Sequence, residues 1–152
     1  MHKKLLPTLA SCLLALALHA APAASAELRI GLSGEVSSLD PHLLASQPNL
    51  TVARHVFESL TDVDPQTKLV PGLAESWRAL DPLTWEFRLR RGVKFHDGSE
   101  FTAEDAAFSL ARPLSIRGSP GGFASYVRAV ESATAVDTHT PRVRPKSPYC
   151  AL

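Results

Sequence analysis

The chain has 152 residues, enough for one domain of ordinary size. Its 16 Lys and Arg residues nearly balance 15 Asp and Glu residues, which argues against a surface built for nucleic acid or for an anionic membrane. An apolar content of 45% is typical of a globular protein, and 12 prolines with 8 glycines favour an α/β chain with many turns over a helical bundle.

The first 26 residues have the pattern of a secretory signal peptide. Lys3 and Lys4 form a basic start, residues 13–18 lie in an apolar stretch, and Ala24-Ser25-Ala26 offers small residues for cleavage. The apolar stretch is shorter than the ~20 residues that a membrane-spanning helix needs. We therefore expect an exported protein whose mature part is residues 27–152.

The cysteines predict no disulfide. Cys12 ends a Leu-Ala-Ser-Cys sequence similar to a lipoprotein box, but cleavage there would leave most of the apolar stretch on the product. Lipid anchoring through Cys12 is a question that the sequence leaves open. Removal of residues 1–26 leaves Cys150 without a cysteine partner.

The first mature segment predicts a strand, a loop and a helix. Leu28, Ile30 and Leu32 alternate with polar residues or glycine, which is typical of a strand over residues 27–33 with one buried face. A loop follows over residues 34–42. Apolar residues at helical spacing then predict a helix that starts at Asn49 or Thr51; they are Val52, Ala53, Val56, Phe57 and Leu60.

The middle of the chain predicts turns around one clear strand. Residues 61–68 form a turn, residues 73–77 a single helical turn, and Asp81-Pro82 another turn. Residues 84–91 alternate cleanly and predict a strand. Its core-facing residues are Trp85, Phe87 and Leu89.

The last third predicts a capped helix and a hairpin. After a turn at Asp97-Gly98, Thr102 and Asp105 have the spacing of a capping box that begins a helix ending near Ala111. A loop and a short helix over residues 123–130 come next. Two strands then follow, over residues 132–137 and 142–146, although Pro141 and Pro145 would remove hydrogen-bond donors from the second.

No catalytic or metal-binding motif stands out. The chain has no Gly-x-Ser-x-Gly elbow and no phosphate-binding loop with its lysine. The neighbouring pairs Asp40 with His42 and His96 with Asp97 are explained as turn residues. The histidine spacing predicts no metal site, and nothing indicates a cofactor. A binding module and a secreted enzyme whose groups meet only in space both fit.

Several motifs together resemble one family. In order they are SLDPH at 38–42, VFESL at 56–60, LVPGLAESW at 69–77, TWEFRLRRGVKFHDG at 84–98, FTAED at 101–105 and FSL at 108–110. This set is similar to bacterial extracellular solute-binding protein family 5, the peptide-, dipeptide- and nickel-binding components of ABC importers. The likeness continues through residues 136–137, 142–144 and 147–149.

The resemblance implies a fold, a location and partners. It implies an α/β chain that forms part of the first lobe of a two-lobed periplasmic-binding-protein (type II) fold. The protein would be a periplasmic monomer that delivers a peptide or other small solute to an ABC permease in the inner membrane. It would need no cofactor, bind no nucleic acid and not be an enzyme.

The resemblance also implies which loops touch the solute. These are the segment from about Glu35 to Asn49 and the segment from about Ser119 to Tyr126. The residues expected at the solute are Ser37, Leu44, Asn49, Phe123 and Ser125.

Some features depart from the family pattern. Family members are several hundred residues long, so the resemblance implies a truncated first lobe without the second. Pro141, Pro145 and Cys150-Ala151-Leu152 do not fit the pattern, and a frameshift near the end would explain them. The alternatives left open are a nickel- or other small-solute-binding protein of the family, a fragment without function and a secreted enzyme.

Overall fold

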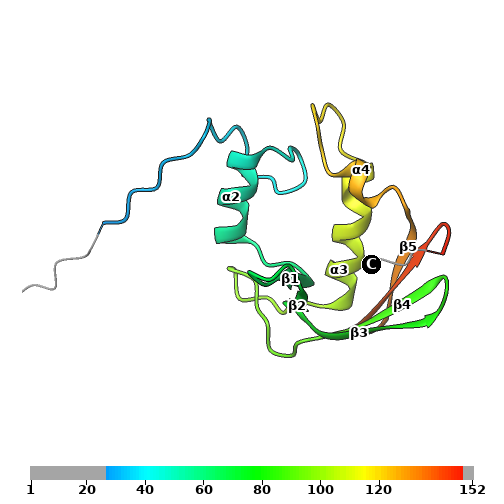
Figure 1. Ribbon diagram of the computed structural model, residues 1–152. Helices are drawn as coiled ribbons and strands as arrows, with labels where there is room; N and C mark the ends of the chain where they lie inside the picture. Colours follow the sequence, from blue (N-terminus) through cyan, green and yellow to red (C-terminus); the bar gives the residue numbers. More distant parts are fainter. Residues whose placement is uncertain (1–26, 149–152) are drawn as a thin grey trace, which may run out of the picture. The chain divides into compact units, whose positions relative to one another are not determined.

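The computed structural model of the chain describes residues 27–148. The chain divides into a part that ends at Gly31 and a compact unit that begins at Leu32. The helices and strands of the compact unit (Figure 1) are, in order, α2 (Gln47–Val56), β1 (Thr61–Val63), β2 (Leu69–Pro71), β3 (Ala74–Asp81), β4 (Thr84–Leu89), α3 (Ala103–Ala111), the 3₁₀ helix η1 (Arg112–Leu114), α4 (Ala124–Val127), β5 (Val130–Asp137) and β6 (Thr140–Pro145). The signal peptide predicted over residues 1–26 lies outside the described residues, as does Cys150.

The prediction of a strand over residues 27–33 is wrong. This segment has no regular secondary structure, and Leu28 and Ile30 are 82% and 56% exposed. A half-buried strand needs a neighbouring strand for its backbone and a core for its apolar face. Among residues 27–148, no strand pairs with this segment.

The main sheet consists of two antiparallel hairpins laid side by side. Its strand order is β3-β4-β6-β5, so the β3–β4 hairpin meets the β5–β6 hairpin along the β4–β6 boundary. That boundary, which we call the seam, contains only the pairs Trp85–Val143 and Glu86–Arg142. The backbone N–H of Leu89 adds one bond to the carbonyl of His139, at 2.8 Å.

Helix α3 packs against β5 and β6 and completes the core. Its buried positions are Ala103 and Ala106, whose small side chains allow the helix to approach the sheet closely. The core residues come from both hairpins, from α3 and from the segment before it: Ala74, Phe87, Leu89, Phe101, Ala103, Ala106 and Val143. Trp85 is half-buried against this core, so the core-facing residues predicted for residues 84–91 are confirmed.

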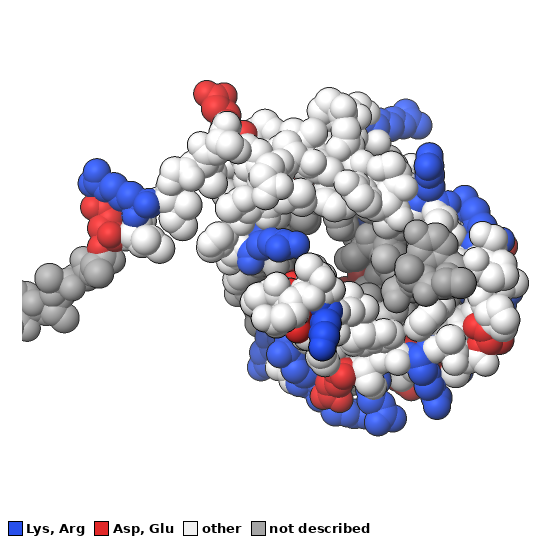
Figure 2. Space-filling view, in the orientation of Figure 1, with Lys and Arg blue, Asp and Glu red and all other residues white. Residues whose placement is uncertain are grey.

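The opposite face of the sheet is rich in arginine. Glu86, whose side chain is 14% exposed, lies between Arg78 of β3 at 2.7 Å and Arg142 of β6 at 2.8 Å. The Glu86–Arg142 ion pair therefore links β4 to β6 across the seam, where only two residue pairs join the strands. Figure 2 shows basic side chains gathered along the lower edge of the view, in the region of β3, β4 and the loop that follows β4.

Several predicted elements are confirmed. The capping box is present, with the Thr102 N–H donating to Asp105 Oδ2 at 2.8 Å. The turn at Asp97-Gly98 closes a small hairpin, and Gly98 has a φ of 89°, which favours glycine. The two final strands form at slightly different bounds, as β5 and β6.

Other predictions require correction. Residues 74–77 belong to β3, and Leu73 precedes the strand, so the predicted helical turn over residues 73–77 is wrong. Trp77 pairs with Phe87 across the hairpin, and this pairing overrides the helix preference of Leu, Ala and Glu. Helix α2 starts earlier than predicted and ends before Phe57, which is extended. The helix predicted over residues 123–130 is only the single turn of α4.

The prolines of β6 are accommodated although the strand is central. Pro141 and Pro145 are both buried, and they flank the two residues that pair with β4. They lie opposite Ala135 and Val130 of β5. The short seam therefore falls between the two positions that lack an N–H group.

Candidate functional site

The two loops expected at the solute lie side by side. We call residues 35–49 the first loop and residues 119–126 the second loop. Leu44 forms a parallel bridge with Gly121, and the Ala45 N–H donates to the Gly121 carbonyl at 3.0 Å. The Ser119 hydroxyl donates to the Leu43 carbonyl. Segments more than 70 residues apart in the chain therefore form one surface.

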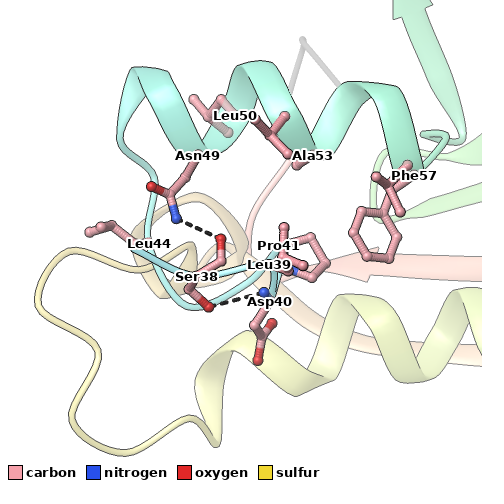
Figure 3. A pocket seen from close by; sticks show the side chains of 11 residues that line it. Ser38, Leu39, Asp40, Pro41, Leu44, Asn49, Leu50, Ala53 and Phe57 are labelled. Carbon is pink, nitrogen blue, oxygen red and sulfur yellow. Dashed lines mark hydrogen bonds between the residues drawn. The ribbon is translucent and has the colours of Figure 1, made fainter. Parts of the chain in front are cut away.

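Asn49 holds the first loop together. It is 5% exposed, and its Nδ2 donates to the Ser38 carbonyl at 2.8 Å (Figure 3). Its Oδ1 accepts from the Ser46 hydroxyl at 3.0 Å and, more weakly, from the Ser37 N–H at 3.4 Å. Because a buried amide without partners is costly, these bonds fix the path of the loop against the start of α2.

The hollow between the first loop and α2 is too small for a solute. Its volume is about 10 Å³, close to the lower limit for one water molecule. Figure 3 shows its walls, which comprise Ser38, Leu39, Asp40, Pro41, Leu44, Asn49, Leu50, Val52, Ala53, Val56 and Phe57. The hollow is therefore a packing boundary between loop and helix.

The other expected solute residues differ in exposure. Ser37 and Ser125 are exposed, whereas Leu44 and Phe123 are half-buried. The ring of Phe123 lies 5.5 Å from that of Tyr126, which is 72% exposed. These side chains can offer hydroxyl groups and apolar surface to a ligand.

A cluster that the sequence reasoning missed lies beside the first loop. Arg112 makes a bidentate ion pair with Asp40, with Nη2–Oδ2 at 2.6 Å and Nη1–Oδ1 at 2.8 Å. Its Nη1 also lies 3.1 Å from His42 Nδ1. Asp40 and His42 do form the predicted turn, with the His42 N–H donating to Asp40 Oδ1 at 2.9 Å. The sequence signal was their proximity, but nothing in the spacing pointed to Arg112.

The ion pair and burial together set the charge state of this cluster. The hydrogen bonds from Arg112 lower the pKa of Asp40 to about 2, although desolvation opposes them. Burial, and then the Arg112 charge, lower the pKa of His42 below its usual 6.5. The cluster therefore holds an ionised carboxylate and a neutral imidazole near neutral pH.

Of the pair His96 and Asp97, Asp97 has the local turn role that was predicted. Asp97 accepts hydrogen bonds from the Ser99 N–H at 2.9 Å and the Ser99 hydroxyl at 2.7 Å, which closes the turn. Across residues 27–148, no three His, Cys, Asp or Glu side chains gather as metal ligands would. None of the helices in that same range is both long and apolar enough to cross a membrane.

With the loops and the sheet defined, comparison with known proteins is informative. The family model described as "Bacterial extracellular solute-binding proteins, family 5 Middle" matches residues 68–151. The chain belongs to this family. The periplasmic oligopeptide-binding protein OppA of Escherichia coli is 40% identical over 80 residues, which are 53% of this chain and 15% of that protein.

The murein peptide-binding relative extends further along the chain. The periplasmic murein peptide-binding protein MppA of Escherichia coli is 30% identical over 138 residues, covering 80% of this chain and 26% of the relative. Its solved structure matches with a TM-score of 0.71 and 28% identity, over 78% of this chain and 26% of that one. The expected periplasmic-binding-protein fold is thereby confirmed, and the chain spans about a quarter or less of the length of these relatives.

A metal-complex-binding relative matches almost as well. The structure of NikZ from Campylobacter jejuni in complex with Ni(L-His) has a TM-score of 0.67 and 26% identity, covering 76% of this chain and 23% of that chain. Peptide and nickel-complex binders thus share the architecture seen here. The architecture alone does not distinguish between the two kinds of solute.

Proposed function

We propose that this chain supplies part of the solute-binding surface of a periplasmic binding protein for an ABC importer, with peptides as its solutes. The observation that carries the proposal is the junction of the first and second loops, where Leu44 meets Gly121. Both loops were expected at the solute for reasons independent of their contact. Relatives named for oligopeptides and murein peptides support the peptide assignment.

In this proposal the expected solute residues divide into two roles. Ser37, Leu44, Phe123 and Ser125 contact the solute directly, through hydroxyl groups and apolar surface. Asn49 acts indirectly, because its amide is engaged within the first loop and fixes the position of Ser37 and Ser38.

The cellular context belongs to the same proposal. Residues 1–26 direct export and are removed, residues 27–152 act as a monomer in the periplasm, and the loaded protein delivers solute to the inner-membrane permease. The protein performs no chemistry on its solute. In keeping with this role, the surface of the loops offers hydrogen bonds and apolar contact.

Nuclear magnetic resonance tests the peptide proposal, because it detects binding even when affinity is weak. The full chain, labelled with ¹⁵N, is titrated with L-trialanine, and D-trialanine serves as the matched control. We expect amide shifts concentrated in residues 35–49 and 119–126, saturable with the L-peptide and absent with the D-peptide. Equal shifts with both peptides, or shifts confined to other segments, would contradict the proposal.

The second candidate is a nickel complex, favoured by the structural likeness to the Ni(L-His)-binding protein. A parallel titration with the paramagnetic nickel(II)–histidine complex, which shifts and broadens the amide signals of nearby residues, separates the two. Shifts in the same loops with this complex and none with L-trialanine would replace the peptide assignment by a metal-complex assignment.

A further inference from the structure

Arg112 occupies a well-anchored position between α3 and the second loop. It is the first residue of η1, and its backbone N–H still donates to the Phe108 carbonyl of α3. Its carbonyl accepts from the Ser115 N–H at 2.9 Å and from the Ser115 hydroxyl at 2.8 Å. The guanidinium group therefore extends from a backbone held on both sides.

From this anchor the guanidinium group contacts the first loop twice. It binds the Asp40 carboxylate through two parallel hydrogen bonds, and this geometry fixes the orientation of the two groups as well as their distance. Its Nη1 also lies 3.1 Å from His42 Nδ1. Asp40 and His42 precede Arg112 in the sequence by 72 and 70 residues.

The chemistry of the contact between Arg112 and His42 defines the protonation state of His42. A guanidinium group offers only donors and stays charged, so His42 Nδ1 must be the acceptor. The ring is then neutral, with its proton on Nε2. A protonated ring would lose the acceptor and place a second positive charge beside Arg112.

His42 carries the contact onward to the second loop. Its ring lies 6.4 Å from the ring of Phe123, with an interplanar angle of 65°, an edge-to-face geometry. Phe123 is the N-cap of α4. The charged groups that act on His42 are Arg112 and Asp40, and Phe123 adds an uncharged wall.

We propose that Arg112 is a positioning residue that couples the two loops of the candidate solute site: it holds Asp40 and neutral His42, and His42 holds Phe123. The proposal rests on the proposed function for its effect on solute binding. The coupling itself is a property of the chain and can be measured without solute.

The decisive variant is Arg112→Gln, compared with Arg78→Gln as a matched control. The control also removes one arginine ion pair, but on the sheet face that carries Glu86. With Arg112→Gln we expect the pKa of His42 to rise, since a neighbouring positive charge is lost, and the amides of residues 119–126 to shift. The Arg78 variant leaves both unchanged. An unaltered His42 titration and unaltered second loop in a folded Arg112 variant would overturn the proposal.

Two further variants guard against simple unfolding. Arg112→Lys keeps the positive charge but not the planar guanidinium group that binds Asp40 through two hydrogen bonds. We therefore expect a smaller rise in the pKa of His42 and smaller shifts of the second-loop amides than in Arg112→Gln. His42→Gln retains a side-chain acceptor for Arg112 but lacks the ring that contacts Phe123, so we expect the amides of residues 119–126 to shift in a folded protein. A folded His42→Gln variant whose second loop keeps its wild-type shifts would show that His42 does not hold Phe123, which overturns the proposed chain of contacts.

Solute affinity gives the functional readout. In the wild type, L-trialanine affinity falls as the pH drops through the pKa of His42, whereas in His42→Gln it stays level over that range. Arg112→Gln lowers affinity about fivefold or more at pH 7. If the wild type binds no peptide, the proposed function fails, yet the solute-free titration of His42 still decides the coupling. If the wild type binds L-trialanine with an affinity that does not change when His42 is protonated, this result counts against the coupling proposal.

Discussion

At the residue scale, the most informative side chains are those that join distant segments. Asn49 was expected at the solute because of the family resemblance, and its near-complete burial with bonds to Ser38 and Ser46 explains why an amide suits this position. Asp40 and His42 were predictable as turn residues from their spacing. Their partner Arg112 was not, because no local pattern encodes a contact 72 residues away.

The Asp40–Arg112 pair predicts a specific pH dependence of stability. The folded pKa of Asp40 is about 2, below its ordinary 3.8, so the carboxylate stabilises the fold above about pH 4 and loses this effect as the pH falls toward 2. Because both side chains are partly exposed, we expect Asp40→Asn to cost about 1 kcal/mol at pH 7. Urea unfolding of both proteins from about pH 7 down to about pH 2, a range that includes the window between the two pKa values of Asp40, measures the difference.

The exposed Glu131, which has no ion pair among residues 27–148, provides the control. Glu131→Gln should change stability little at any of these pH values. A difference in the free energy of unfolding between wild type and Asp40→Asn that stays constant down to pH 2 would show that the ion pair does not stabilise the fold.

At the scale of elements, the sequence predicted best where local and long-range preferences agree. Strand β4 combines strict alternation with aromatic residues, and α3 begins at a complete capping box, so both were predictable. The error at β3 arose because Ala, Glu and Leu favour a helix locally, while pairing with β4 decides the outcome. The alternating segment at 27–33 failed for the opposite reason, since its pattern is suitable but none of the described strands pairs with it.

The capping box gives a prediction for α3. Thr102→Ala removes the capping hydroxyl, and we expect a loss of about 1 kcal/mol in the free energy of unfolding. Thr102→Ser retains the hydroxyl and should lose much less. Thermal unfolding followed by circular dichroism compares the two variants, and equal losses would mean that the methyl group rather than the cap matters.

At the scale of the whole molecule, the family assignment and the fold agree while the solute remains a proposal. The matched relatives bind peptides in some cases and a nickel complex in another, according to their names, with one shared architecture. The sequence motifs that identify the family lie largely in the sheet and α3. The candidate solute residues lie in the two loops, where hydrogen bonds rather than periodic patterns determine structure, so the motifs predicted the family better than the site.

The seam between β4 and β6 has a consequence for how the chain reaches this structure. Each hairpin closes a short loop, whereas the seam joins strands separated by residues 90–139 and has only two residue pairs with which to offset the lost chain entropy. Local hairpins should therefore form before the seam closes, and seam closure should limit the folding rate.

Stopped-flow folding tests this order. Trp77→Ala, which removes the cross-strand pair with Phe87, should mainly slow folding, because the β3–β4 hairpin is already present in the transition state. Ala53→Gly in α2, expected to cost about 1 kcal/mol, should mainly speed unfolding, because that helix docks later. The opposite pattern would mean that the two loops and α2 nucleate folding, and that the sheet assembles on them afterwards.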